Sequence, residues 1–150
     1  MNPFHSGVLL NEAILSLNVV SGEKYIDCTA GGGDYTEAVL AKGGIVLGID
    51  QDSAAIDYCT NRFSNQIKNH QLILSNGNFE SVADIAAKEN FNGVAGIVYD
   101  FGISSNQLDD RERGFSFKYK DAKLDMRMSL ANNVKASDLL MALDDYNLIK

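Results

Sequence analysis

The stretch YIDCTAGGGDYT, at residues 25–36, decides the fold that this sequence predicts. A short strand is expected over residues 24–28, and a helix is expected to leave the glycine cluster over residues 36–42. Glycines between a strand and a helix let the backbone turn tightly and approach a ligand closely. A turn that binds nothing also fits, and the dinucleotide fingerprint is incomplete because Thr36 stands where its third glycine belongs.

Strands and helices alternate along the rest of the chain. Apolar strands are expected at residues 45–49, 71–74 and 94–99, and helices at residues 8–17, 53–63, 80–88 and 136–143. This alternation is typical of βαβ units around a parallel sheet that is covered on both faces. The sequence therefore predicts an α/β fold with a partial parallel sheet flanked by helices.

The composition is that of one ordinary globular domain. The chain has 150 residues, of which 45% are hydrophobic and 22% are charged. It has no apolar run long enough for a membrane helix and no signal-peptide pattern, so we expect a cytoplasmic protein without a membrane partner. Cys28 and Cys59 form no metal-binding pattern, so two buried free thiols and no metal site are expected.

The charge is unevenly distributed along the chain. The formal net charge is −7, but residues 111–128 contain six basic and three acidic residues. Because phosphate contacts need Lys and Arg, the acidic balance argues against general binding of nucleic acid. A basic segment on an acidic protein indicates one localised anionic partner.

Polar clusters follow three of the predicted strands. They lie at residues 27–36, 50–52 and 100–107. In open parallel sheets, ligands bind outside the carboxyl ends of the strands. Asp50 is placed there to accept hydrogen bonds from ribose hydroxyls. Helix capping is the alternative, and Asp52 or Ser53 is better placed for that role.

Each of three further residues has two possible roles. Phe79 can lie against an adenine face or pack as a core or helix-staple residue. The loop that begins at Asp100 resembles in position the loop with which amino-methyltransferases hold a target amine. Asp100 is therefore a candidate for orienting an amine or the amino-acid end of a cofactor, and capping of the loop is the alternative. His5 is a lone histidine, a kind that is more often structural.

Aromatic and basic residues interleave after this loop. If residues 115–119 are extended, Phe115, Phe117 and Tyr119 share one face and Lys118 and Lys120 the other. That arrangement suits a flipped or single-stranded base beside phosphates. An amphipathic edge strand explains the pattern equally well.

Longer blocks make the pattern specific. The chain carries residues 25–33, 48–52 and 77–79 in order, then DFGISSNQLD at 100–109, RGFSF at 113–117 and LDMRM at 124–128. With these blocks the sequence resembles the 16S ribosomal RNA (cytosine-N4)-methyltransferase family, also called MraW. The resemblance extends over nearly the whole chain.

The resemblance implies a class I methyltransferase core, which is Rossmann-like, with an inserted helical substrate domain. It implies S-adenosylmethionine as cofactor and N4-methylation of a cytosine in the decoding region of bacterial 16S ribosomal RNA, within the small ribosomal subunit. Asp100 is the expected catalytic residue. By position, the cofactor contacts fall on Gly31, Gly33, Asp34, Tyr35, Asp50, Phe79, Asp100 and Gln107. The candidates for RNA contacts are Ser104, Ser105, Arg113, Phe115, Phe117 and Arg127.

Some positions depart from the family pattern. Asp34 and Tyr35 stand where the family usually has Gly-His. A carboxylate beside the cofactor can pair with its ammonium group or repel its carboxylate. Asn106 replaces a usual proline, and Ser129 replaces a usual aspartate.

Family members are about twice as long as this chain, consistent with a domain plus an insertion. Residues 1–150 are therefore expected to be the N-terminal part of the methyltransferase domain, with the inserted domain beginning near 130–150 and later strands following Lys150. Exposed sheet edges leave a homodimer open. One alternative is a truncated, non-catalytic remnant that binds the cofactor or the ribosome. The other is a nicotinamide-dependent reductase, supported only by Gly31, Gly33 and Asp50.

Overall fold

The computed structural model describes Gly7, residues 9–144 and residues 146–147, so His5 lies outside the described residues. The chain forms two compact units, which divide between Gly102 and Ile103. None of the helices in the described part is long and apolar enough to cross a membrane.

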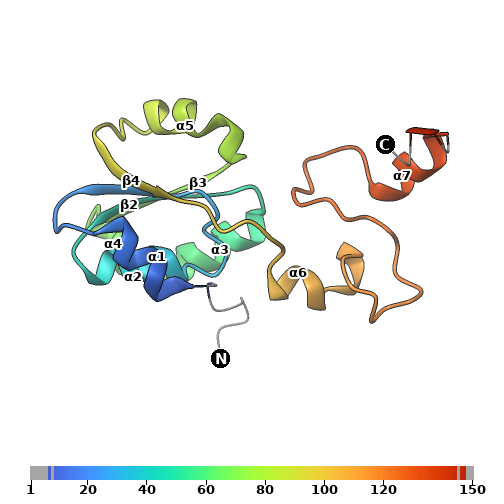
Figure 1. The fold of residues 1–150 in the computed structure, drawn as a ribbon, viewed down its shortest axis with the longest axis horizontal. Helices are drawn as coiled ribbons and strands as arrows, with labels where there is room; N and C mark the ends of the chain where they lie inside the picture. Colours follow the sequence, from blue (N-terminus) through green and yellow to red (C-terminus); the bar gives the residue numbers. More distant parts are fainter. Residues whose placement is uncertain (1–6, 8, 145, 148–150) are drawn as a thin grey trace. The chain divides into compact units, whose positions relative to one another are not determined.

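The first unit is a four-stranded parallel sheet flanked by helices (Figure 1). Its strands are β1 (Lys24–Asp27), β2 (Ile45–Asp50), β3 (Leu72–Asn76) and β4 (Val94–Val98), in the spatial order β3-β2-β1-β4. Its helices are α1 (Leu10–Leu17), α2 (Asp34–Ala41), α3 (Ser53–Arg62), α4 (Ser64–Lys68) and α5 (Val82–Lys88), with the 3-10 turn η1 (Phe79–Ser81) before α5. The predicted α/β fold is confirmed, although α4 was not expected.

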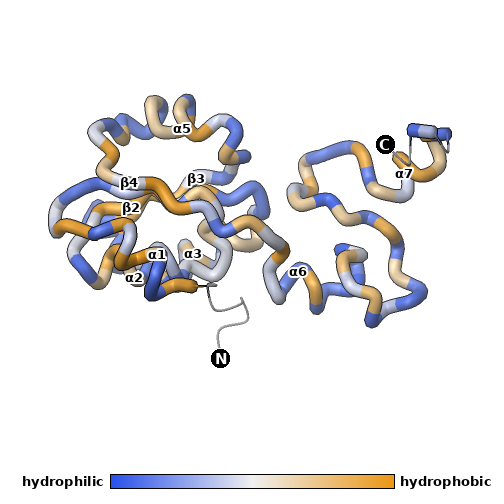
Figure 2. The backbone as a smooth tube through the Cα atoms, viewed as in Figure 1, coloured by the Kyte–Doolittle hydropathy of each residue, from blue (hydrophilic) through white to orange (hydrophobic). Residues whose placement is uncertain are grey.

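The strands are apolar on both faces because helices cover both faces. Figure 1 shows α5 on one face of the sheet and α1 to α4 on the other. Alternate strand residues follow this division: Tyr25 and Val46 join the core under α1 to α4, and Ile26 and Leu47 join the core under α5. Figure 2 shows the resulting hydrophobic colour along β2 and β4.

The two cysteines lie in these cores. Cys28 packs on the α5 side and Cys59 on the other, and both are buried free thiols, as expected. Burial raises the pKa of the Cys59 thiol to about 12, so this thiol is neutral and inert at physiological pH.

The second unit contains α6 (Ser105–Asp109), the 3-10 turn η2 (Arg111–Arg113) and α7 (Ala136–Ala142). Residues 115–119 are not extended, so the condition for the two-faced pattern is not met and no edge strand forms there. The Tyr119 amide donates to the Ser116 carbonyl at 3.4 Å and the Lys118 amide to the Ser116 Oγ at 3.2 Å, which closes a turn. Serine favours such turns because its hydroxyl satisfies a nearby backbone donor. The two-faced pattern is therefore lost, and the Lys118 ammonium lies 5.4 Å from the Tyr119 ring centre.

Candidate functional site

The loop between β1 and α2 requires glycine. Gly31 (φ +49°) and Gly33 (φ +84°) both adopt left-handed backbone conformations. A Cβ atom on Gly33 would overlap the Phe63 ring. The Ala30 amide donates to the Ile49 carbonyl at 2.9 Å, which holds the loop against the end of β2. The loop is thus narrow, and its backbone can come close to a ligand at the carboxyl edge of the sheet.

Asp27, the last residue of β1, anchors the start of α2. Its buried carboxylate accepts a hydrogen bond from the Thr36 hydroxyl at 2.8 Å and another from the Thr29 amide at 3.2 Å. Burial raises the pKa of Asp27 to about 6, and these two hydrogen bonds oppose the rise. Sequence reasoning gave neither threonine a role. Thr36, at the third position of the dinucleotide fingerprint, is fully buried and used in this anchor.

Asp50 joins the glycine loop to the end of β2. One carboxylate oxygen accepts from the Gly31 amide at 2.8 Å and the other from the Asp52 amide at 2.9 Å. Burial raises the pKa of Asp50, and both hydrogen bonds oppose the rise. The carboxylate keeps acceptor capacity beyond these bonds, because a carboxylate can accept about four hydrogen bonds. The expected cap of α3 is confirmed at Asp52, whose side chain accepts from the Ala54 amide at 3.1 Å.

Asp34 is held by an arginine that sequence reasoning did not single out. The Arg62 guanidinium lies 3.2 Å from the Asp34 carboxylate and 2.6 Å from that of Glu37, and it donates to the Gly32 carbonyl. The same guanidinium lies 4.9 Å from the centre of the Phe63 ring. Arg62 stands 28 residues after Asp34, on a different helix, so no local motif connects the two. The carboxylate that departs from the family pattern therefore pairs with an arginine that it shares with Glu37.

Tyr35 and Asp100 approach the same edge from α2 and from the end of β4. The Tyr35 ring is buried in the core under α1 to α4. Burial raises the pKa of Tyr35, and the next contribution comes from the charge of Asp100. The Asp100 amide donates to the Thr29 hydroxyl at 2.8 Å, which fixes the loop after β4 against the loop after β1. Within the described chain, no hydrogen bond or ion pair engages the Asp100 carboxylate.

Three aromatic rings gather beside these loops. Phe79 lies 5.8 Å from Tyr99 and 5.5 Å from Phe101, and the Tyr99 and Phe101 rings stack at 5.6 Å between centroids. Phe101 is 72% exposed. Phe79 contacts the core under α5, as a core residue would, and it also borders the exposed Phe101 ring, where an adenine could lie. Tyr99 and Phe101 were missed, since a strand-end aromatic alone does not reveal its neighbours.

The residues predicted to contact RNA lie in the second unit, where Ser104 and Gln107 form a capping box. The Gln107 amide donates to Ser104 Oγ at 3.2 Å, and the Ser104 amide donates to Gln107 Oε1 at 3.0 Å. This S-x-x-Q pattern was a readable helix signal within a segment taken for a loop. Ser105 is the first residue of the capped helix α6.

The two predicted arginines are engaged within the second unit. Arg113 is buried and donates to the Arg127 carbonyl at 3.0 Å and to the Met128 carbonyl at 2.9 Å. Arg127 forms a two-point ion pair with Asp125, at 2.8 Å for both hydrogen bonds. The hydrogen bonds from Arg127 hold the pKa of Asp125 down at about 2. Phe115 and Phe117, by contrast, line a cavity formed by residues 114–126.

Comparison with known proteins places this geometry in a family. The model of the MraW methylase family matches residues 2–150. The chain belongs to the MraW methylase family. No group of three or more His, Cys, Asp or Glu side chains in the described part is placed to hold a metal ion.

Curated relatives of this MraW-family chain carry the name "Ribosomal RNA small subunit methyltransferase H". The protein of Mycoplasmopsis agalactiae is 46% identical over 145 residues, which cover 95% of this chain and 46% of that protein. The protein of Fusobacterium nucleatum is 38% identical over 152 residues, covering 99% of this chain and 48% of that protein. The chain thus spans about half the length of the curated relatives it matches.

A solved structure is also similar. It is a protein of Clostridium thermocellum, provisionally described as an rRNA methylase, with 20% identity and a TM-score of 0.45. The similarity covers 50% of this chain and 43% of that one.

Proposed function

We propose that the protein binds S-adenosylmethionine at the carboxyl edge of its sheet, for methylation of a cytosine N4 amine in the decoding region of 16S ribosomal RNA. Membership of the MraW methylase family supports methyl transfer, and the names of the relatives support an rRNA of the small ribosomal subunit as substrate. Such a substrate implies work in the cytoplasm.

The hydrogen bond from the Gly31 amide to Asp50 carries the cofactor part of this proposal. It brings the glycine loop and the acidic strand end together, as a nucleoside with a charged tail requires. The free acceptor sites of Asp50 suit the two ribose hydroxyls. The left-handed backbone of Gly33 keeps the loop narrow beside the Phe63 ring, and the half-buried Phe79 ring borders the exposed Phe101 ring, where an adenine could stack. The residues at this edge therefore fit the cofactor.

Asp100 is the proposed catalytic residue. When bound, S-adenosylmethionine supplies an electrophilic methyl group on a sulfonium sulfur. The Asp100 carboxylate accepts a hydrogen bond from the cytosine amine and turns the nitrogen lone pair toward that carbon. It can then receive the amine proton or pass it to water. Its position is fixed by the Thr29 hydroxyl, and within the described chain no cation occupies its oxygens.

The nicotinamide alternative is less well supported. Its third glycine would let α2 approach the sheet closely. Here the Thr36 side chain occupies that position and donates to Asp27 instead. A dinucleotide also needs its pyrophosphate at the N-terminus of α2, where one guanidinium, that of Arg62, pairs with the two carboxylates of Asp34 and Glu37 and leaves a net negative charge.

We further propose that residues 1–150 are the N-terminal part of the methyltransferase domain, and that the inserted substrate domain begins near residues 130–150. A homodimer is a separate proposal. It is supported by β4, an edge strand of the sheet with Ile97 exposed. Light scattering of the purified chain across a concentration series tests it, and a constant monomer mass would refute it.

Calorimetric titration with S-adenosylmethionine tests the cofactor site. We expect binding by the parent chain, loss of it in Asp50→Ala, and retention in Asp57→Ala, which removes an exposed carboxylate from the neighbouring helix α3. Asp50→Asn keeps one acceptor oxygen and should bind weakly. Binding of NADH in place of S-adenosylmethionine would overturn the proposal.

A second measurement separates binding from catalysis. Transfer of a labelled methyl group to small ribosomal subunits, followed by nucleoside analysis, should yield N4-methylcytidine, and Asp100→Asn should slow the transfer while cofactor binding remains. Cofactor binding without any transfer by the parent chain would favour the non-catalytic alternative. Methylation of a base other than cytosine would refute cytosine as the target.

A further inference from the structure

Residues 114–126 of the second unit form a closed loop on a fixed base, called the aromatic loop below. Arg113 clamps the two ends together through the carbonyls of Arg127 and Met128, while the Met126 amide donates to the Arg113 carbonyl at 2.9 Å. At Gly114 (φ +70°), the two segments of the loop run so close together that a Cβ atom would overlap the Lys123 carbonyl. The ends of the loop are therefore rigid, whatever the loop carries at its tip.

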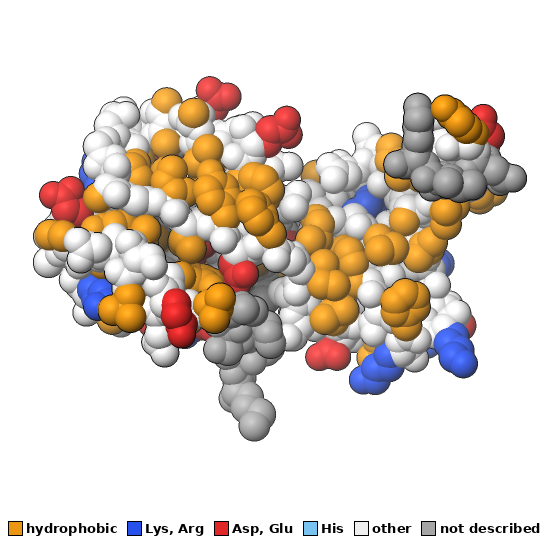
Figure 3. All heavy atoms as spheres, in the orientation of Figure 1, with side chains coloured by type: hydrophobic (Ala, Val, Ile, Leu, Met, Phe, Trp, Pro, Cys, Tyr) orange, Lys and Arg blue, Asp and Glu red, His pale blue; other side chains and the backbone are white. Residues whose placement is uncertain are grey.

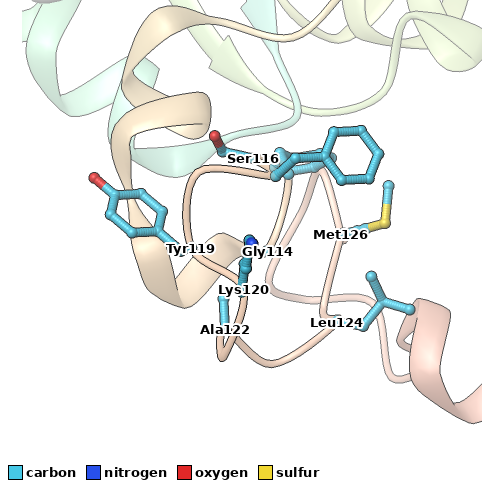
Figure 4. Close-up of a pocket in the computed structure, with 9 residues that line it drawn as sticks. Gly114, Ser116, Tyr119, Lys120, Ala122, Leu124 and Met126 are labelled. Atoms are coloured by element: carbon cyan, nitrogen blue, oxygen red, sulfur yellow. The ribbon is translucent and has the colours of Figure 1, made fainter.

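Residues of the aromatic loop line a partly open cavity of about 440 Å³. This volume falls within the roughly 300–1,000 Å³ typical of small-molecule sites. Phe115, Phe117, Tyr119, Lys120, Leu124 and Met126 are among the residues that line the cavity. Figure 4 shows Leu124 and Met126 on one side of the loop and Tyr119 on the other. The wall of the cavity is thus mainly apolar and aromatic, which suits a ligand with a flat ring.

The Phe117 side chain is fully exposed. Phenylalanine is among the residues most often buried, so a fully exposed ring that lines a cavity is suited to contact a partner. Apolar side chains also gather across the visible face of the second unit (Figure 3). A base stacked on Phe117 would cover the ring at little entropic cost, because the ring has only two torsions to fix.

Three lysines belong to the same loop as this ring. Lys118, Lys120 and Lys123 are exposed, and no ion pair with a carboxylate engages them within the described chain. By contrast, Arg111 and Arg127 are paired with Asp121 and Asp125. The three lysines are therefore the charges available to an external anion. A polyanion with flat apolar rings matches both features of the loop.

We propose that the aromatic loop is a binding site for single-stranded RNA, in which one base enters the cavity and stacks on Phe117 while Lys118, Lys120 and Lys123 contact the neighbouring phosphates. This inference rests on the proposed function, since it names the residues that hold the RNA substrate. Single strands fit because their bases are free to leave the stack, whereas a duplex hides them.

A single tryptophan makes the site visible. The chain contains no tryptophan, so Phe117→Trp introduces a unique fluorophore at the proposed stacking position. Titration with a cytidine-containing RNA hexamer should quench this fluorescence. The matched control is Leu15→Trp, which places the fluorophore at an exposed position of α1 and should not respond. Equal quenching in both variants, or none in Phe117→Trp, would overturn the inference.

The lysines are tested by salt dependence. Three phosphate contacts predict a slope of about 2 in log affinity against log salt, at about 0.7 per contact with a single strand. The variant Lys118→Ala, Lys120→Ala, Lys123→Ala should lose most of this slope and bind at least tenfold more weakly. The control Lys42→Ala, Lys68→Ala, Lys88→Ala removes the same charge from exposed positions of the first unit and should keep the slope.

The remaining outcomes separate this inference from the proposed function. Quenching by the RNA hexamer in a chain that fails to bind S-adenosylmethionine would support the loop while the proposed function fails. Cofactor binding with no response of the loop variants to RNA would support the proposed function and overturn the inference about the loop. Equal affinity for double-stranded RNA, or for an acidic peptide of similar charge, would overturn single-stranded RNA as the occupant.

Discussion

Replacing Arg62 by alanine should weaken S-adenosylmethionine binding through the charge of Asp34. Coulomb's law with an effective dielectric constant of about 20 gives about 5 kcal/mol for two unit charges at the observed 3.2 Å. The side chains of Arg62 and Asp34 remain 23% and 16% exposed, so screening and the ordering of both side chains reduce the net coupling to about 1–2 kcal/mol. A repulsion of the same size on the cofactor carboxylate would lower the affinity about tenfold.

The sign of the effect follows from the charge that is left. Without Arg62, the Asp34 carboxylate loses its ion-pair partner, although the Gly7 amide still donates to it at 3.2 Å, and its charge opposes the carboxylate end of the cofactor. The Gly32 carbonyl also loses its donor. Asp34→Asn in the Arg62→Ala background should therefore restore most of the affinity, whereas Asp34→Asn alone should change it little.

Calorimetric titration of the parent chain, both single variants and the double variant measures the coupling directly. Urea unfolding followed by circular dichroism shows whether each variant remains folded. Arg111→Ala, which breaks an exposed ion pair with Asp121 in the second unit, is the control and should leave cofactor affinity unchanged. Effects that add within about 0.5 kcal/mol would refute the reasoning, because independent sites behave in that way.

Three further predictions concern stability. Asp27 has its pKa raised to about 6 on folding, so the stability of the parent chain should fall relative to Asp27→Asn as pH rises from about 4 to about 6. The total is about 3 kcal/mol, measured by urea unfolding at each pH, and parallel curves would reject it. Gly33→Ala should cost at least about 2 kcal/mol, from the left-handed backbone and the overlap with the Phe63 ring, whereas Gly22→Ala (φ +85°, open space) should cost about 1. Equal thermal shifts would contradict this. Ser104→Ala should remove about 1 kcal/mol from α6, so hydrogen exchange at the Gln107 amide should rise about fivefold. Unchanged exchange would show that the capping bond is not needed.

The sheet was predictable because its signals are local. Each strand is a short apolar run bounded by turn residues, and the run at residues 45–49 needs helices on both faces wherever it lies in the sheet. The glycine cluster and Asp50 were likewise readable, since each stands directly at a strand end. Their mutual contact follows from the parallel topology, which brings the ends of β1 and β2 to one edge.

Contacts between distant side chains were not predictable from the same signals. Arg62 looks like an ordinary residue at the end of an amphipathic helix, and only the folded chain places it on Asp34 and Gly32. Tyr99 and Phe101 became part of an aromatic group because the fold brings the Phe79 ring, from the turn after β3, against them, although β3 and β4 lie at opposite edges of the sheet. The tertiary fold decided these neighbours, and no local spacing encodes them.

The aromatic loop shows how one local hydrogen bond changes a functional interpretation. Alternation over residues 115–119 would put the rings on one face and the lysines on the other, so a ligand could meet only one kind of side chain at a time. The Ser116 hydroxyl and carbonyl instead close a turn. The turn puts Phe117, Tyr119 and Lys120 around one cavity, where a stacked base and its phosphate can be held together. In the turn, these residues are therefore better suited to bind a nucleotide than they would be in an extended strand.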